Sequence, residues 1–284
     1  MIRNGTLVGL VVALLLPASS AFGATISLER TIRTTPFDGT SVSMKDHEGS
    51  AFVPVDNSLW LADDNGDAIF EVNPTTGALK RRIPQADFNA APRFGGGAQA
   101  GANRTEDFES LAYDVTSDTL YLFSGRCCSS SILPTAFRLT RKNGTLQVTD
   151  WQPLASTADF TGAAWNPGDD RVYVGKGRMF RSFDYATATQ GPTFSVTGVS
   201  GITGMDFSAS GTDLFITNNN ERLIRINWGT RTIVSGWNFD VTPFGMRDSR
   251  AVALVAGRYF VSDGADSRAS GDPLKYAVFV FGAA

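Results

Sequence analysis

The sequence has 284 residues, of which 42% are hydrophobic and 19% charged, a balance that excludes intrinsic disorder and collagen-like repetition. Its 25 basic and 28 acidic residues give a formal net charge of -3, so the basic excess needed to bind nucleic acid is missing. One histidine and two cysteines exclude sites that need several imidazoles or four thiolates. The 29 glycines and 20 phenylalanines favour short strands joined by tight turns, which predicts an all-β protein.

Residues 1–23 have the order of a secretory signal peptide: Arg3, an apolar run over 7–16, then small residues up to Gly23. A membrane anchor is the alternative, but the run has about half of the roughly 20 apolar residues that a spanning helix needs. We therefore expect cleavage before Ala24 and no transmembrane anchor. The remaining residues, 24–284, are predicted to form one secreted domain, extracellular or periplasmic.

An internal repeat begins soon after the predicted cleavage point. Four pairs of residues are each eleven positions apart, namely Glu48 and Leu59, Glu109 and Leu120, Thr161 and Val172, and Thr203 and Leu214. A turn rich in Asp, Asn, Ser or Gly separates the members of each pair, and an apolar strand follows the second member. A fifth copy, from Arg250 to Tyr259, is two residues shorter. Each copy therefore predicts two antiparallel strands.

Each copy continues into a third strand, expected at 68–72, 135–139, 179–183 and 223–226, and then a fourth. Short antiparallel strands that recur in this way are typical of a β-propeller, so we predict a single propeller of five four-stranded blades. Residues 276–281 alternate like a third strand of the last blade, and 25–31 would supply its fourth strand and close the ring. A sixth blade would require 82–105 to be structured, whereas its glycines indicate a long loop. A β-sandwich is the alternative fold.

Acidic residues recur where the first strand of a blade enters the central channel. Residues two apart on a strand point the same way, so Asp46 and Glu48 are expected to converge with Asp107 and Glu109 of the next blade. Clustered carboxylates repel one another until a cation or a proton relieves them, and calcium prefers oxygen ligands. We predict a calcium site at these four residues. The alternative is that the acids only cap turns through hydrogen bonds to the backbone.

Basic residues are expected on another side of the same channel mouth. The repeat places Lys176, Arg178 and Arg250 there, and Asp63 begins the acidic loop 63–67 between the second and third strands of the first blade. These four residues are our candidates for binding a small anionic ligand.

Cys127 and Cys128 are adjacent in a chain that we expect to be exported. Thiols tend to oxidise outside the cytoplasm, so we predict a strained disulfide between these neighbours, although free thiols or an intermolecular bond are alternatives.

Two phrases of the sequence resemble a known family. Asp-His-Glu-Gly-Ser-Ala at 46–51 and Asp-Phe-Glu-Ser-Leu-Ala-Tyr at 107–113 are similar to the motif of SdiA-regulated and esterase-like phytase propellers. Ser110 replaces the glycine of that motif. The resemblance implies a propeller, often with six blades, that holds calcium in or near the channel.

Two functions follow from these observations. The first is an exported binding module whose mouth, with a calcium site, binds a small anionic ligand or an envelope or extracellular protein. The alternative is a calcium-dependent hydrolase of phosphate or other esters, in which Asp46, Glu48, Asp107 and Glu109 hold the metal. The single histidine favours the binding module, and we expect a monomer.

Overall fold

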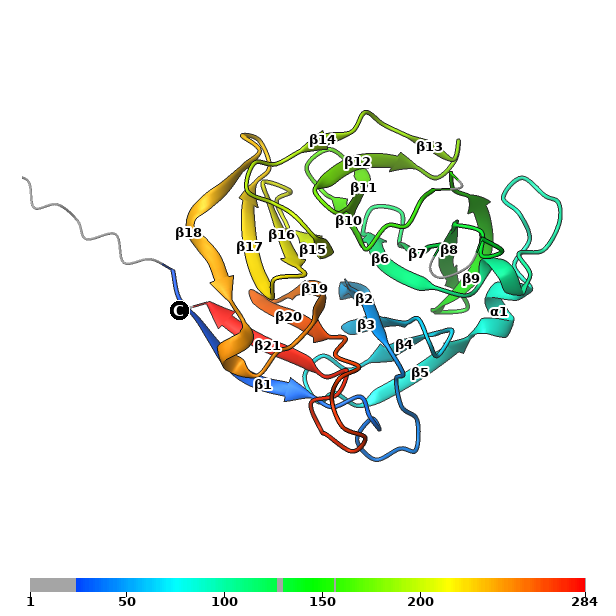
Figure 1. Ribbon diagram of the computed structural model, residues 1–284. Helices are drawn as coiled ribbons and strands as arrows, with labels where there is room; N and C mark the ends of the chain where they lie inside the picture. Colours follow the sequence, from blue (N-terminus) through cyan, green and yellow to red (C-terminus); the bar gives the residue numbers. More distant parts are fainter. Residues whose placement is uncertain (1–23, 127–129, 156, 284) are drawn as a thin grey trace, which may run out of the picture.

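The computed structural model describes residues 24–126, 130–155 and 157–283, and these form five antiparallel β-sheets arranged in a ring (Figure 1). Each sheet is one blade. The predicted all-β propeller of five blades is confirmed, and the alternative of a two-layer sandwich is wrong, because five sheets are arranged radially around a common axis instead of two sheets forming two layers.

The blades follow one another along the chain, each running from an inner to an outer strand. The first comprises β2 (His47–Val53), β3 (Ser58–Asp63), β4 (Ala68–Val72) and β5 (Leu79–Pro84). The second comprises β6 (Phe108–Asp114), β7 (Thr119–Ser124), β8 (Thr135–Lys142) and β9 (Thr145–Pro153). The third comprises β10 (Gly162–Asn166), β11 (Arg171–Lys176), β12 (Met179–Asp184) and, both beside β12, β13 (Thr189–Gln190) and β14 (Phe194–Ser195).

The fourth blade comprises β15 (Ile202–Phe207), β16 (Asp213–Asn218), β17 (Arg222–Asn227) and β18 (Thr232–Asp240). The fifth comprises β19 (Ser249–Val255), β20 (Arg258–Asp263), β21 (Val278–Ala283) and, paired antiparallel with β21, β1 (Ile26–Ile32). The strands include every third strand that the repeat predicts. β21 begins two residues later than expected, because Tyr276 has a left-handed backbone with a φ of 57°.

The inner strands form a closed circle around the axis. Each contacts the inner strand of the next blade, in the order β2, β6, β10, β15, β19 and back to β2 (Figure 1). Because every blade has a neighbour on both faces, its second strand is largely buried on both sides, and in β3 all six residues are buried. In β3, Trp60 and Ala62 pack towards the second blade, whereas Leu59 and Leu61 pack towards the fifth.

The segment 82–105, for which the sequence predicts a long loop, has short regular elements at both ends and a loop over 90–101 between them. β5 extends to Pro84, a short helix α1 (Gln85–Asn89) follows, and a single 3-10 turn η2 spans Ala102–Arg104. Phe88 anchors the helix, since its ring lies 4.9 Å from that of Phe108 and 5.2 Å from that of Phe137. The segment therefore covers the second blade and adds no sixth sheet among the described residues.

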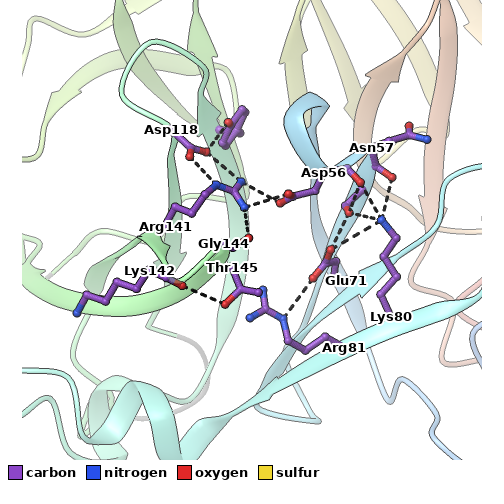
Figure 2. A network of polar contacts seen from close by, with 12 residues as sticks. Asp56, Asn57, Glu71, Lys80, Arg81, Asp118, Arg141, Lys142, Gly144 and Thr145 are labelled. Carbon is purple, nitrogen blue, oxygen red and sulfur yellow. Dashed lines mark hydrogen bonds and ion pairs between the residues drawn. The ribbon is translucent and has the colours of Figure 1, made fainter.

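An ionic network joins the first two blades on the face opposite the strand entrances (Figure 2). Arg141 of β8 donates two hydrogen bonds of 2.9 Å to Asp56, which lies in the 3-10 turn η1 (Pro54–Asp56) between β2 and β3. The same guanidinium donates to Asp118 at 2.7 Å and to the carbonyl of Gly144 at 2.8 Å. The three-way contact fixes the β2–β3 turn against the neighbouring blade.

Two predictions fall outside the described residues: the signal peptide at 1–23 and the pairing of Cys127 with Cys128. Within the ranges that the structure does describe, no helix is long and apolar enough to cross a membrane.

Candidate metal centre

The acidic anchors of the repeat lie at irregularities in the inner strands. In β2 the register skips between His47 and Gly49, so Glu48 is an extra residue opposite β3. The same shift leaves Glu109 extra in β6 and Thr203 extra in β15. A β-bulge re-aims the side chain that it carries and often lies beside functional sites. In three of the four copies with the eleven-residue spacing, the first anchor is therefore a bulge at the entrance of the channel, whereas the pairing of β10 with β11 has no shift.

The backbone repeats at the same places. The carbonyl of Asp107 accepts a 2.8 Å hydrogen bond from the amide of Gly125, which follows β7. Equivalent bonds join Asp46 to Asp64, Gly201 to Asn219 and Asp248 to Gly264. Each bond holds the start of an inner strand next to the end of the second strand, which brings both loops to one face of the ring.

Three carboxylates converge at this face. Asp107, Glu109 and Asp159 each offer one oxygen, and these oxygens all lie within 4.8 Å of one another. Asp107 and Glu109 are only 4% and 8% exposed. The carboxylates surround Gly125: a Cβ at this position would lie 2.6 Å from Asp159 Oδ1 and 2.8 Å from both Asp107 Oδ2 and Glu109 Oε1. The glycine thus keeps open a small cradle lined by oxygens, and we call these three acids the carboxylate triad.

Glu48, which the sequence groups with the triad, is already neutralised by a cation. Arg250 Nη1 lies 2.9 Å from Glu48 Oε1 and 3.0 Å from Oε2, and Arg250 Nε bonds Asp248 at 2.9 Å. Arg250 comes from β19 of the fifth blade, so this ion pair crosses between the last and first blades. It fills the side of the mouth next to the triad with a paired charge.

Asp46 lies behind Glu48 and has one satisfied oxygen. Its Oδ2 accepts a 2.9 Å hydrogen bond from the side chain of Asn65. Among the described residues no partner is within hydrogen-bonding distance of its buried Oδ1, and the residue is 7% exposed. A buried carboxylate oxygen without a donor is costly unless a proton, a water molecule or a cation satisfies it.

Burial and the crowding of negative charge raise the pKa values of the carboxyl groups at the mouth. Burial raises the pKa of Glu109 well above its usual range, and the charges of Glu48, Asp107 and Asp159 raise it further. Burial likewise raises the pKa of Asp64 to about 7, with Asp107 and Asp46 adding to the effect. Burial raises the pKa of Asp46 to about 6, although the charge of Arg250 opposes this. The mouth therefore favours uptake of positive charge, as protons or as a cation.

The four predicted ligand-binding residues have different surroundings. Lys176 pairs with Asp159 of the triad, and its side chain is 50% exposed. Arg178 lies exposed in the turn between β11 and β12. Asp63 is fully buried and accepts hydrogen bonds from the amides of Lys45, Asp46 and Gly66. Arg250 is held by Glu48 and Asp248, as described above. Asp63 thus shapes the loop that presents Asp46.

His47 points into the interior, away from the acids beside it. It is fully buried, its Nδ1 lies 3.4 Å from the carbonyl of Tyr276, and burial lowers its pKa to about 4. A neutral, buried imidazole has no contact with the mouth. It does not serve there as a general base.

The channel is filled directly below the mouth. The inner strands approach so closely that a Cβ on Gly204 would lie 2.4 Å from Ala251 Cα, and one on Gly49 would lie 2.7 Å from Ser110 Cα. Within the described part of the chain, the space between the inner strands has no volume that a water molecule could occupy. Any ligand of the triad therefore arrives from the mouth face.

The donor set fits a hard divalent cation. All three triad ligands are carboxylate oxygens, which calcium and magnesium prefer, and none is an imidazole or thiolate. The sequence predicts Asp107 and Glu109 as calcium ligands and does not assign Asp159 to the metal. It places the loop that begins at Gly125 at the mouth but gives this glycine no role, because a glycine that makes room carries no chemical signal of its own.

No protein-family model and no curated protein matches the sequence, so the resemblance to SdiA-regulated and esterase-like phytase propellers stays a prediction. Solved structures do match. The glutaminyl cyclase of Myxococcus xanthus has 12% identity and a TM-score of 0.60, over 92% of this chain and 97% of that one.

Two other solved structures each match over 92% of this chain, with a TM-score of 0.53. One is the PQQ-bound aldose sugar dehydrogenase of Streptomyces coelicolor, with 11% identity over 98% of its own chain. The other is a luciferin-regenerating enzyme, with 13% identity over 95% of its chain. At these identities the likeness is one of fold alone. The chain thus shares its β-propeller architecture with enzymes of unrelated activities.

Proposed function

We propose that the protein is an exported β-propeller binding module that holds calcium at the channel mouth through Asp107, Glu109 and Asp159. The observation that carries this proposal is the convergence of the three carboxylates around Gly125. The composition of residues 1–23 supports export, and calcium is abundant outside cells. Of the other two acids predicted from sequence, Glu48 is paired with Arg250, and Asp46 lies outside the three proposed ligands.

The coordination number explains why such a site binds ligands. Calcium takes six to eight oxygens, and three carboxylates supply only part of that number. The remaining positions face the solvent side of the mouth and suit an oxygen-rich partner, either a small anionic ligand or an acidic group of an envelope or extracellular protein. Lys176, being half exposed, is free to leave Asp159 when a cation binds.

A calcium-dependent ester hydrolase is the second candidate. It is favoured by the enzyme names of the solved structures that share the fold, although none of these names describes ester hydrolysis. It is disfavoured because the only histidine is buried and because Arg250 is engaged by carboxylates instead of being available for an anion.

Calcium titration of chelator-treated protein tests the proposal, with elemental analysis to prove that the metal was removed. We expect saturable calorimetric binding, with one calcium per chain. Asp159→Asn should weaken it at least about tenfold, because a charge-assisted contact is lost. Asp46→Asn, the matched control outside the triad, should weaken it far less. Absence of saturable binding in the wild type, or equal loss in the two variants, would contradict the assignment.

The same preparations separate the two functions. Hydrolysis of phosphate and carboxylic esters is measured with and without calcium. If the wild type hydrolyses an ester only with calcium, and Asp159→Asn abolishes this activity, the protein is a hydrolase and the binding-module proposal is wrong. Calcium binding without turnover supports the binding module.

A further inference from the structure

A polar cleft that is separate from the carboxylate triad lies on the mouth face, outside the channel. Its volume is about 500 Å³, and it lies between the segment that links β1 to β2 and the loop that links β20 to β21. These two segments lie side by side at the edge of the ring, next to the fifth and first blades (Figure 1). None of its residues belongs to the eleven-residue repeat.

The lining of this cleft is cationic. Arg33 and Lys45 come from the first wall and Lys275 from the second, and Thr35, Ser43 and Ser270 also line the cleft. No aspartate or glutamate is among the described residues that line it. Ammonium and guanidinium groups only donate hydrogen bonds, so the cleft offers several donors with positive charge and lacks a built-in counter-ion.

The three cations differ from those at the mouth because no carboxylate in the described chain lies within ion-pair distance of them. Arg33 makes only long hydrogen bonds, of 3.3 and 3.4 Å, to the carbonyl of Thr35. Lys275 Nζ lies 3.5 Å from the carbonyl of Asp266 and 5.1 Å from the centre of the Tyr276 ring. By contrast Lys176 and Arg250 at the mouth are both paired with acids.

The nearest acids are engaged elsewhere. The carboxylate of Asp266 accepts a hydrogen bond from the hydroxyl of Tyr276. The carboxylate of Asp63 accepts hydrogen bonds from the backbone amides of Lys45 and Asp46 and does not contact the Lys45 ammonium. Lys45 interacts electrostatically with Asp63 and Asp67 without forming an ion pair, and no acid lines the cleft among the described residues, so its lining keeps a net positive charge.

The walls are held rigidly, so the cleft is formed before any ligand arrives. Thr34 Oγ1 donates a 2.7 Å hydrogen bond to the carbonyl of Tyr276, and Thr35 Oγ1 donates one of 2.7 Å to the carbonyl of Lys275. The amide of Met44 bonds the carbonyl of Thr34 at 2.9 Å, and Met44 itself is buried beneath the cleft. A preformed site loses less conformational entropy on binding.

We propose that this cleft binds a phosphate or sulfate group through Arg33, Lys45 and Lys275. Such a tetrahedral oxyanion accepts hydrogen bonds in several directions at once and matches donors placed on two facing walls. It fills only part of a cleft of about 500 Å³, so the natural ligand is an organic phosphate or sulfate. The inference does not depend on the calcium site, which lies at the carboxylate triad.

Calorimetric titration of the full chain tests this proposal. Inorganic phosphate is titrated into calcium-free protein at constant ionic strength, followed by sulfate, glycerol 2-phosphate and acetate. We expect saturable binding of phosphate and sulfate, tighter binding of the organic ester, and much weaker binding of acetate. Tighter sulfate than glycerol 2-phosphate would identify a sulfated ligand. Equal affinity for acetate, or no saturable phosphate binding, would overturn the proposal.

Variants locate the binding. Lys45→Gln and Lys275→Gln should each weaken phosphate binding roughly tenfold, since each removes one charge-assisted hydrogen bond. Lys142→Gln is the matched control, because Lys142 lines a different cleft, of about 520 Å³, that also contains Asp87. Unchanged thermal melting would show that the variants fold. If Lys142→Gln weakens phosphate binding as much as the other variants do, the attraction is non-specific and the assignment is contradicted. An unchanged calcium affinity in Lys275→Gln would show that the two sites are separate.

Discussion

Gly125 offers the sharpest test of the carboxylate triad, because replacing it removes no ligand. In Gly125→Ala the new methyl carbon would lie 2.6 to 2.8 Å from one oxygen of each triad residue, closer than the 3.0 Å below which something must shift. The backbone at Gly125 does not have a positive φ, so alanine is compatible with its conformation. The substitution therefore acts on the cradle and not on the turn.

The expected effect can be stated as a loss of calcium stabilisation. A ligand at about 100 times its dissociation constant stabilises the folded state by about 2.7 kcal/mol. For a chain of this size that corresponds to a rise in melting temperature of roughly 5 to 10 °C. We expect the wild type to show this rise and Gly125→Ala to show almost none, because the displaced oxygens can no longer converge on one ion. The methyl itself should cost the metal-free protein about 1 to 3 kcal/mol.

The assay is differential scanning calorimetry of chelator-treated protein with and without excess calcium. Gly229→Ala is the matched control, since its Cβ would meet only Asn227 Oδ1, at an ordinary 3.6 Å, and Gly229 lies in a turn of the fourth blade. This control should keep the full calcium response. If the Gly125→Ala protein folds and calcium raises its melting temperature as much as that of the wild type, the hypothesis that the three carboxylates bind calcium around Gly125 is refuted.

Further predictions concern pH and the ionic network. The pKa of Asp64, about 7, lies above its value in the unfolded chain, so between about pH 4 and 7 the folded protein holds a proton that the unfolded chain has lost. The urea stability of metal-free protein should therefore fall as pH rises through this window, and calcium should flatten the slope. His47 has the opposite effect, because its folded pKa of about 4 is below the unfolded value near 6.5. Its contribution to the free energy of unfolding therefore grows as pH rises from about 4 to 6.5 and partly offsets the fall caused by Asp64. His47→Phe removes this offset, so the stability of the variant should fall more steeply with rising pH than that of the wild type. In a double-mutant cycle, Arg141→Gln and Asp56→Asn should show a coupling of about 1 kcal/mol that shrinks at high salt, because both side chains are partly exposed; additive effects would contradict a working network.

The architecture was predictable because the repeat is local. Each eleven-residue spacing joins two neighbouring strands of one hairpin, and the third strands follow within a short stretch of chain. A periodic pattern of this kind can be recognised from the sequence alone, without knowledge of long-range contacts. The short helix α1 within segment 82–105 was not predicted, because one buried aromatic, Phe88, anchors it and a single residue makes no pattern.

The site was only partly predictable, because the repeat fixes position without fixing partners. Asp107 and Glu109 occupy positions equivalent to those of Asp46 and Glu48. Only Asp107 and Glu109, however, belong to the triad. The difference is Arg250, which is 202 residues from Glu48 along the chain and reaches it across the last blade interface. Ion pairs between residues so far apart in sequence depend on the three-dimensional positions of the side chains, which the repeat pattern does not contain. The cationic cleft was invisible for the same reason, since its two walls come from loops outside the repeat.

The filled centre of the ring has a practical consequence. Because the inner strands of the described chain leave no space for a water molecule along the axis, a ligand can reach the triad only from the opening on the mouth face. The turn between β8 and β9, next to Gly144, lies on the face remote from that opening. A fluorophore, a fusion partner or a surface linker placed there would leave the opening unobstructed, so the protein can be immobilised in one orientation and its ligands counted as they arrive.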